Sequence, residues 1–160
     1  MSTHLIYGGV GSRDTPPHAC EAMERIGVAL CKRGWILRSG GAIGADRAFQ
    51  RGAEAVDRTM LEIFNADDAV GHVEAHQDAA AHHPAWERCN RSARLLLARN
   101  SLIVRGHDMQ THILFLVCWT ERGQVIGGTG QTMRVCASAG IPIFNLWNPE
   151  CEKLVLEFAR

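Results

Sequence analysis

An α/β fold, with a mainly parallel sheet of about five strands and helices on both faces, is predicted by two features of this 160-residue chain. Short apolar runs alternate with helical stretches along the sequence, which is typical of parallel strands joined by helical crossovers. Glycine-rich segments follow several of the apolar runs, as expected for strand-to-helix connections. The length is that of one domain, so we treat residues 1–160 as a single domain.

The five expected strands are short and mostly apolar. The first ends in glycines, and the fourth is a nearly continuous apolar run, as a strand covered on both faces would be. Helices are expected between and after the strands. The first of them spaces Ala19, Met23, Ile26 and Leu30 three or four residues apart and is followed by Gly34. The expected strands are residues 4–8, 35–38, 60–65, 112–119 and 141–146, and the expected helices are residues 16–33, 44–56, 86–104, 129–139 and 149–160.

Residues 66–84 are polar, rich in alanine and histidine, and poorly periodic. The segment is long for a loop, so we expect a short helix within it. Because it follows the third strand, it is a candidate lid over a site at that edge of the sheet. His72 and His76 are four residues apart, but no HExxH motif is present. We therefore favour a mobile polar loop and predict no metal site.

Composition restricts the classes of function. The 17 basic and 17 acidic residues give zero net charge, which argues against non-specific binding to nucleic acid. No apolar run is long enough to cross a bilayer, and no signal peptide is recognisable at the start of the sequence. The six cysteines show no CxxC spacing. We expect a cytoplasmic protein with reduced thiols and no membrane partner.

Three glycine-rich segments carry the functional signal. They are residues 8–14 (GGVGSRD), 39–46 (SGGAIGAD) and 127–132 (GGTGQT). Glycine lets the backbone approach a ligand closely, and the amides at a helix N-terminus favour an anion. Taken singly, each segment is explained equally well as a tight strand-to-helix connection. Because the carboxyl ends of parallel strands share one edge, the three together favour one phosphate-bearing ligand.

Polar side chains within these segments take expected roles. Ser12 would donate to a phosphate oxygen and Arg13 would form a fork with it. Ser39 and Thr129 would donate hydroxyl hydrogen bonds. Asp46 either accepts from a ribose hydroxyl or stabilises the N-terminus of its own helix, and the sequence does not choose between these roles.

Four motifs resemble one protein family and cover residues 4–146. Ser39-Gly40-Gly41-Ala42-x-Gly44-Ala45-Asp46 resembles the SGGAxG[AI]D turn of the DNA-processing protein A (DprA/Smf) domains and the wider SLOG superfamily. Gly11-Ser12-Arg13 is similar to their GSR motif, and Arg99-Asn100-x-x-Ile103-x-x-Gly106 to their RNxxIxxG motif. Gly127-Gly128-Thr129-Gly130 is similar to the GGxGT turn of the related phosphoribohydrolases, the lysine-decarboxylase-like branch.

This resemblance implies a Rossmann-like nucleotide-binding domain that is commonly dimeric. It also implies a ligand role for Arg99 and Asn100. The phosphoribohydrolases carry a glutamate at the position of Arg134, so the resemblance does not extend to that carboxylate. The expected ligand-binding residues are Gly9, Gly11, Ser12, Arg13, Ser39, Gly40, Gly41, Ala42, Gly44, Asp46, Arg99, Asn100, Gly127, Gly128, Thr129, Gly130 and Gln131.

Three functions follow, and the first is favoured. The protein binds a nucleotide or a nucleotide-derived ligand, with no cofactor predicted and a homodimer possible. Alternatively, it cleaves an N-glycosidic or phosphoester bond of a nucleotide, with Glu121 or Asp46 as general base. The third alternative, a single-stranded DNA-binding or protein-interaction module, is disfavoured for DNA by the zero net charge.

Overall fold

The computed structural model describes residues 4–160 and contains one five-stranded sheet in which every neighbouring pair is parallel. The order across the sheet is β3-β2-β1-β4-β5. The predicted α/β class, with a parallel sheet of about five strands, is confirmed. The strands are β1 (Ile6–Gly9), β2 (Ile36–Ser39), β3 (Leu61–Ile63), β4 (Leu116–Cys118) and β5 (Ile143–Asn145).

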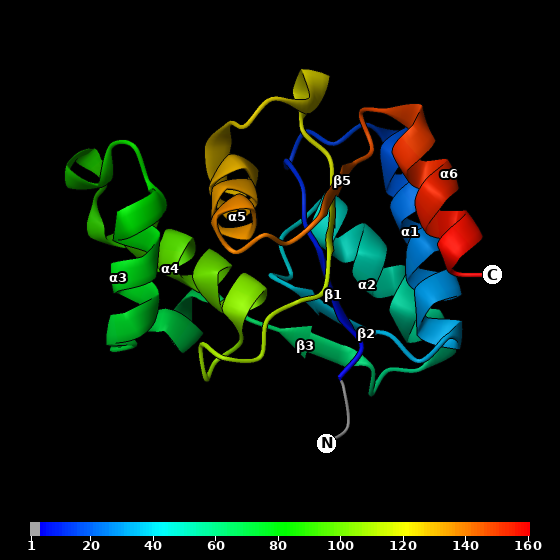
Figure 1. Ribbon diagram of the computed structural model, residues 1–160, viewed down its shortest axis with the longest axis horizontal. Helices are drawn as coiled ribbons and strands as arrows, with labels where there is room; N and C mark the ends of the chain where they lie inside the picture. Colours follow the sequence, from blue (N-terminus) through cyan, green and yellow to red (C-terminus); the bar gives the residue numbers. More distant parts are fainter. Residues whose placement is uncertain (1–3) are drawn as a thin grey trace.

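Helices cover both faces of the sheet, which gives the Rossmann-like arrangement (Figure 1). On one side, α1 packs against both α2 and α6, while on the other side α4 packs against both α3 and α5. Within the described residues, no helix combines the length and apolar character needed to cross a membrane. The helices are α1 (Pro17–Lys32), α2 (Ala45–Val56), α3 (Val73–His82), α4 (Arg91–Arg105), α5 (Gly127–Ser138) and α6 (Pro149–Phe158).

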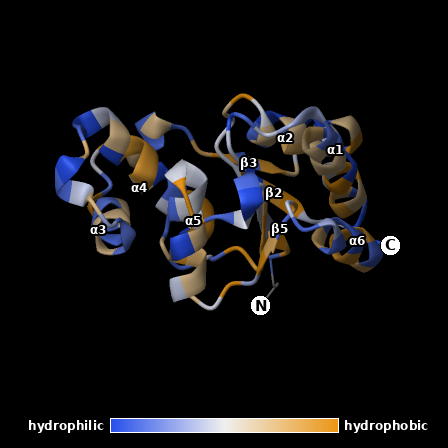
Figure 2. Ribbon diagram, turned by 90° about the horizontal axis from the view of Figure 1, so that it is seen from above, coloured by the Kyte–Doolittle hydropathy of each residue, from blue (hydrophilic) through white to orange (hydrophobic). Residues whose placement is uncertain are grey.

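The strand order creates a switch point between β1 and β4. The chain runs from β1 outward to β2 and β3, then returns across the sheet and places β4 on the other side of β1. In open α/β sheets the ligand crevice lies at the carboxyl edge beside such a point. The amide of Ser12 donates to the carbonyl of Trp119 (3.2 Å), which ties these two loops together. Seen from above in Figure 2, the strands are largely hydrophobic and lie between the two helical layers.

Two helix starts differ from the prediction by more than one residue. Helix α4 begins at Arg91 rather than at residue 86, because the side chain of Asn90 caps it by accepting from the Ala93 amide (2.8 Å). A separate turn of 3-10 helix, η2 (Trp86–Arg88), precedes it. Helix α5 begins at Gly127, two residues before the expected start, so the third glycine-rich segment is itself the first turn of the helix.

Residues 66–84 form the 3-10 helix η1 (Ala66–Ala69) and then α3, which confirms the expected short helix. Helix α3 is fixed to the neighbouring helices. Gln131 donates to Ala79 O (3.0 Å), and Arg134 donates to His82 O (2.9 Å). Apart from the bond to Gln131, no hydrogen bond of this segment in the described residues reaches the glycine-rich segments. The segment forms an outer layer on α4 and α5, and its role as a lid stays a prediction.

Histidines of this segment bind backbone atoms rather than one another. His72 accepts from the Ala75 amide through Nδ1 (3.2 Å), so its Nε2 donates to the carbonyl of His107 (2.7 Å). The ring of His76 contacts Ala69 O (3.0 Å). In residues 4–160, no group of three or more histidine, cysteine or carboxylate side chains is arranged to hold a metal ion.

Candidate functional site

The second glycine-rich segment is closed by its own carboxylate. Asp46 lies in the first turn of α2, and its Oδ2 accepts from the amides of Gly40 (3.2 Å) and Ala42 (3.3 Å). The side chain is buried, and this burial raises its pKa to about 6, although the two amides and Arg99 act in the opposite direction. Asp46 thus holds the turn that precedes α2 and makes no hydrogen bond to the amides at the start of the helix, so neither of its two predicted roles is shown.

Arg99 and Asn100 connect the second segment to the third. Nη1 of Arg99 donates to Gly40 O (2.9 Å) and to Phe64 O (3.1 Å), while Nε donates to Asn100 Oδ1 (3.0 Å). Asn100 in turn donates from Nδ2 to Gly128 O (3.1 Å). The side-chain groups that were expected to bind a ligand are therefore engaged with the backbone. These two residues fix the turns relative to one another.

In the first segment, the glycines are required for close packing against α2. A Cβ at Gly9 would lie 2.7 Å from the ring of Phe49, and one at Gly11 would lie 2.5 Å from Cβ of Ala45. These glycines let β1 and its following loop approach α2. Packing alone therefore explains why Gly9 and Gly11 are glycines, without a ligand close to the backbone.

The hydroxyls of the first two segments also make contacts within the protein. Ser39 donates to Gly9 O (2.6 Å) and is fully buried, while Oγ of Ser12 accepts from the Asp14 amide (3.1 Å). Ser39 is therefore not available to donate to a phosphate, contrary to the prediction. Arg13 remains exposed on the loop after β1. Burial lowers the pKa of the Arg99 guanidinium, and the charge of Arg13 adds to this shift while Asp46 opposes it.

The N-terminus of α5 differs from those of the other α-helices in residues 4–160. A side chain caps α3, α4 and α6, and Asp46 lies in the first turn of α2. Helix α1 has no cap, but it starts with Pro16-Pro17, which carry no N–H groups. Helix α5 has neither a capping side chain nor an acidic residue in its first turn. Among the α-helices of residues 4–160, α5 alone lacks a capping side chain, an acidic residue in the first turn and a proline at its start.

Three consecutive amides of α5, those of Gly127, Gly128 and Thr129, donate to no acceptor in the described residues. Gly127 has φ +64°, and a Cβ there would meet nothing within 4 Å, so its surroundings are open. A Cβ at Gly128 would meet only Asn100 Nδ2 at 3.6 Å. By contrast, a Cβ at Gly130 would collide with the backbone of Val125.

Gln131 was expected to bind the ligand, and the structure places its side chain elsewhere. It is fully buried, donates to Ala79 O and accepts from Arg134 through Oε1 (2.8 Å). Both ends of its amide thus hold α5 against α3. Arg134 is itself a packing residue whose guanidinium also reaches His82 O.

Neither candidate general base has the surroundings that such a role needs. Glu121 lies in a 3-10 turn, η3 (Glu121–Gly123), where its side chain is exposed and makes no hydrogen bond in the described residues. The carboxylate of Asp46 has a raised pKa, but its Oδ2 is held by two amides below the surface. Catalysis by either residue stays a prediction.

The feature that the sequence reasoning missed is the uncapped start of α5. Ile126 occupies the position before the helix, where serine, threonine, aspartate or asparagine would supply a cap. The signal was present in the sequence as the apolar pair Val125-Ile126 ahead of GGTG. It was not used, because the helix was expected to start at Thr129.

No family model, curated protein or solved structure matches this chain. The resemblance to the DprA and SLOG proteins therefore stays an expectation, carried by the four motifs.

Proposed function

We propose that the protein binds a nucleotide or a nucleotide-derived ligand whose phosphate lies on the amides of Gly127, Gly128 and Thr129. The observation that carries the proposal is the first turn of α5, where these three amides have no partner and no acidic side chain is present. A phosphate oxygen accepts well from such amides, and the helix dipole adds to the attraction.

The position of this turn supports a ligand site. Helix α5 follows β4, which borders the switch point, and open α/β sheets bind ligands at that crevice. The hydrogen bond from Asn100 to Gly128 O holds the turn in place before any ligand arrives. Arg13, exposed on the loop after β1, supplies a guanidinium on the other side of the switch point.

The chemistry of the site favours binding without cleavage. Hydrolysis of an N-glycosidic or phosphoester bond needs a positioned base, and Glu121 and Asp46 are respectively exposed and engaged. The resemblance to the DprA and SLOG proteins agrees with a nucleotide ligand. A homodimer and an interaction with single-stranded DNA stay predictions.

Calorimetry with nucleoside 5′-monophosphates and their parent nucleosides tests the proposal. We expect each binding monophosphate to bind at least roughly tenfold more tightly than its nucleoside, because the charged hydrogen bonds to phosphate are lost in the latter. Chromatography of the same mixtures after incubation separates binding from hydrolysis. Unchanged nucleotides support a binding protein, whereas a free base or nucleoside would establish the hydrolase alternative.

Gly128→Asp is the decisive variant. The new carboxylate lies at the second position of α5. There its attraction to the helix dipole stabilises the helix by about 0.3–1 kcal/mol, whereas it repels a phosphate. We expect the fold to be retained and nucleotide affinity to fall by roughly a hundredfold or more.

Ser92→Asp is the matched control. Ser92 is exposed at the second position of α4, so this substitution adds the same charge near the start of another helix. It should bind as the unaltered protein does. Equal binding by Gly128→Asp, or no binding of any nucleotide by the unaltered protein, would show the proposal to be wrong.

A further inference from the structure

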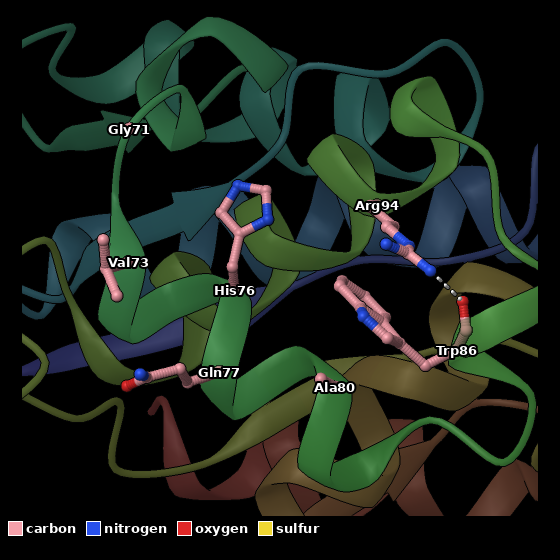
Figure 3. A pocket seen from close by; sticks show the side chains of 7 residues that line it. All are labelled: Gly71, Val73, His76, Gln77, Ala80, Trp86 and Arg94. Carbon is pink, nitrogen blue, oxygen red and sulfur yellow. Dashed lines mark hydrogen bonds between the residues drawn. The ribbon is translucent and has the colours of Figure 1, made fainter.

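A pocket of about 450 Å³ lies away from the glycine-rich segments, between α3, η2 and the first half of α4 (Figure 3). An adjoining hollow of about 260 Å³ shares Gly71, His76 and Arg94 with it. Volumes of this order accommodate small organic ligands. The two hollows are lined by Val70, Gly71, Val73, His76, Gln77, Ala80, Trp86, Arg91, Arg94 and Leu95.

The charge of this lining is positive. Arg91 and Arg94 are three residues apart on α4 and both border the adjoining hollow, and no carboxylate lines either hollow. Arg91 forms no salt bridge within residues 4–160. The nearest competing acid is Glu87, which lies 3.5 Å from Arg94 but is 93% exposed, so that contact is weak.

Arg94 is already fixed in orientation. Its guanidinium lies 5.0 Å from the centre of the Trp86 ring and donates from Nη2 to Trp86 O (3.1 Å), as Figure 3 shows. Its Nε is buried and has no hydrogen-bond partner. His76 is held as well, because its Nε2 contacts Ala69 O.

Besides His76 and Gln77, the rest of the pocket is apolar. Trp86, Val73 and Ala80 offer an aromatic face and aliphatic groups, and Figure 3 shows His76, Arg94 and Trp86 facing the same space. The indole and imidazole rings lie 6.4 Å apart and nearly perpendicular. A planar apolar body therefore has surfaces to contact beside the two guanidinium groups.

We infer that this pocket is a second binding site, for a small anion with a planar apolar body. Its carboxylate or phosphate group accepts from Arg91 and Arg94, and its ring lies against Trp86 and Val73. The site shares no residue with the N-terminus of α5, so it does not depend on the nucleotide proposal.

NMR titration of the ¹⁵N-labelled full chain tests this inference with three probes: benzoate, phenyl phosphate and the neutral benzyl alcohol. We expect one or both anions to shift the indole N–H of Trp86 and the amide of Gly71 below about 10 mM, with benzyl alcohol roughly tenfold weaker or silent. The stronger of the two anions identifies the preferred head group.

Variants separate the site from general attraction to arginine. Arg94→Gln and Arg91→Gln should each weaken the anion titration by roughly tenfold or abolish it, since each removes a charged hydrogen bond. Arg88→Gln removes an exposed arginine of η2 that lines neither hollow, and it should change the affinity less than about twofold. Gly128→Asp should leave this titration unchanged even if it abolishes nucleotide binding.

Three results would overturn the inference. They are the absence of any shift at Trp86 with both anions, equal binding of benzyl alcohol, and equal loss in Arg88→Gln and Arg94→Gln.

Discussion

The second and third glycine-rich segments look alike in sequence, but the structure uses them differently. In residues 39–44, the carboxylate of Asp46 accepts from the amides of Gly40 and Ala42, and Arg99 donates to the carbonyl of Gly40. In residues 127–130, the first three amides have no partner. Two amides of the second segment are thus paired inside the protein, whereas the first three amides of the third segment are open to an external anion. Two glycine-rich segments of similar sequence can therefore differ in whether their amides are paired, and unpaired amides are what an anion requires.

The largest expected effect is the change of stability with pH that the buried carboxyl of Asp46 causes. Burial raises the pKa of Asp46 to about 6 from 3.8. Because the folded-state pKa is above the unfolded value, the folded protein binds more protons between these pH values. The free energy of unfolding contributed by this group is therefore highest below pH 4 and falls by roughly 3 kcal/mol as the pH rises through 6.

Asp46→Asn removes that titration while keeping an acceptor for the two amides. Urea unfolding of the variant and the unaltered protein between pH 4 and pH 7 should show a stability difference that changes with pH in this direction. A constant difference across the range would mean that burial does not raise the pKa of Asp46.

The next effect is the difference in stability loss between an alanine substitution in the second segment and one in the third. A Cβ at Gly40 would lie 2.6 Å from Arg99 Nη1 and 2.9 Å from Asp46 Oδ2, so Gly40→Ala forces apart groups that hydrogen bonds hold together. We expect a loss of about 1–3 kcal/mol in the free energy of unfolding. Gly128→Ala meets only one atom, at 3.6 Å, and should change stability by less than about 1 kcal/mol.

Chemical denaturation of both alanine variants measures this contrast. Similar losses in the two would contradict the view that one segment is closed and the other open. Gly41→Val is a poorer test of ligand binding, because Gly41 has φ +69° and a β-branched side chain is strained there whether or not a ligand binds.

The smallest expected effect on stability comes from removing Asn100, which links the second and third segments through Arg99 and Gly128. Asn100→Ala removes the hydrogen bonds to Gly128 O and from Arg99 Nε, and it should lower stability by about 1–2 kcal/mol. If the link positions the first turn of α5, nucleotide affinity measured by calorimetry should also fall, by roughly threefold to tenfold. A stability loss with unchanged affinity would limit Asn100 to a structural role.

Much of the fold could be predicted from the sequence because its signals are local. The alternation of apolar runs with periodic stretches gave the parallel sheet, and the glycine-rich segments marked where strands end. The start of α4 was placed too early because Trp86 extends the apolar pattern, while the cap at Asn90 decides the boundary. The start of α5 was placed too late because glycines were interpreted as a turn, although they adopt helical hydrogen bonding from Gly127 onward.

The candidate site was predicted less well, since its residues were assigned by type. Arg13 and the amides of 127–129 stay available, whereas Ser39, Arg99, Asn100 and Gln131 bind other parts of the protein. Whether a hydroxyl or guanidinium faces a ligand or a carbonyl depends on which segments meet in space, and sequence spacing does not contain that information.

The sequence by itself determined which segments are strands and helices and which positions must be glycine, because periodicity and backbone freedom are properties of neighbouring residues. Only the tertiary structure decided that Asp46 and Arg99 close one glycine-rich segment and that α5 keeps its amides unpaired. It also brought α3 beside α4 and so formed the Trp86–Arg94 pocket. These outcomes depend on contacts between residues as many as 59 positions apart, as with Gly40 and Arg99, and such contacts follow from packing rather than from local preference.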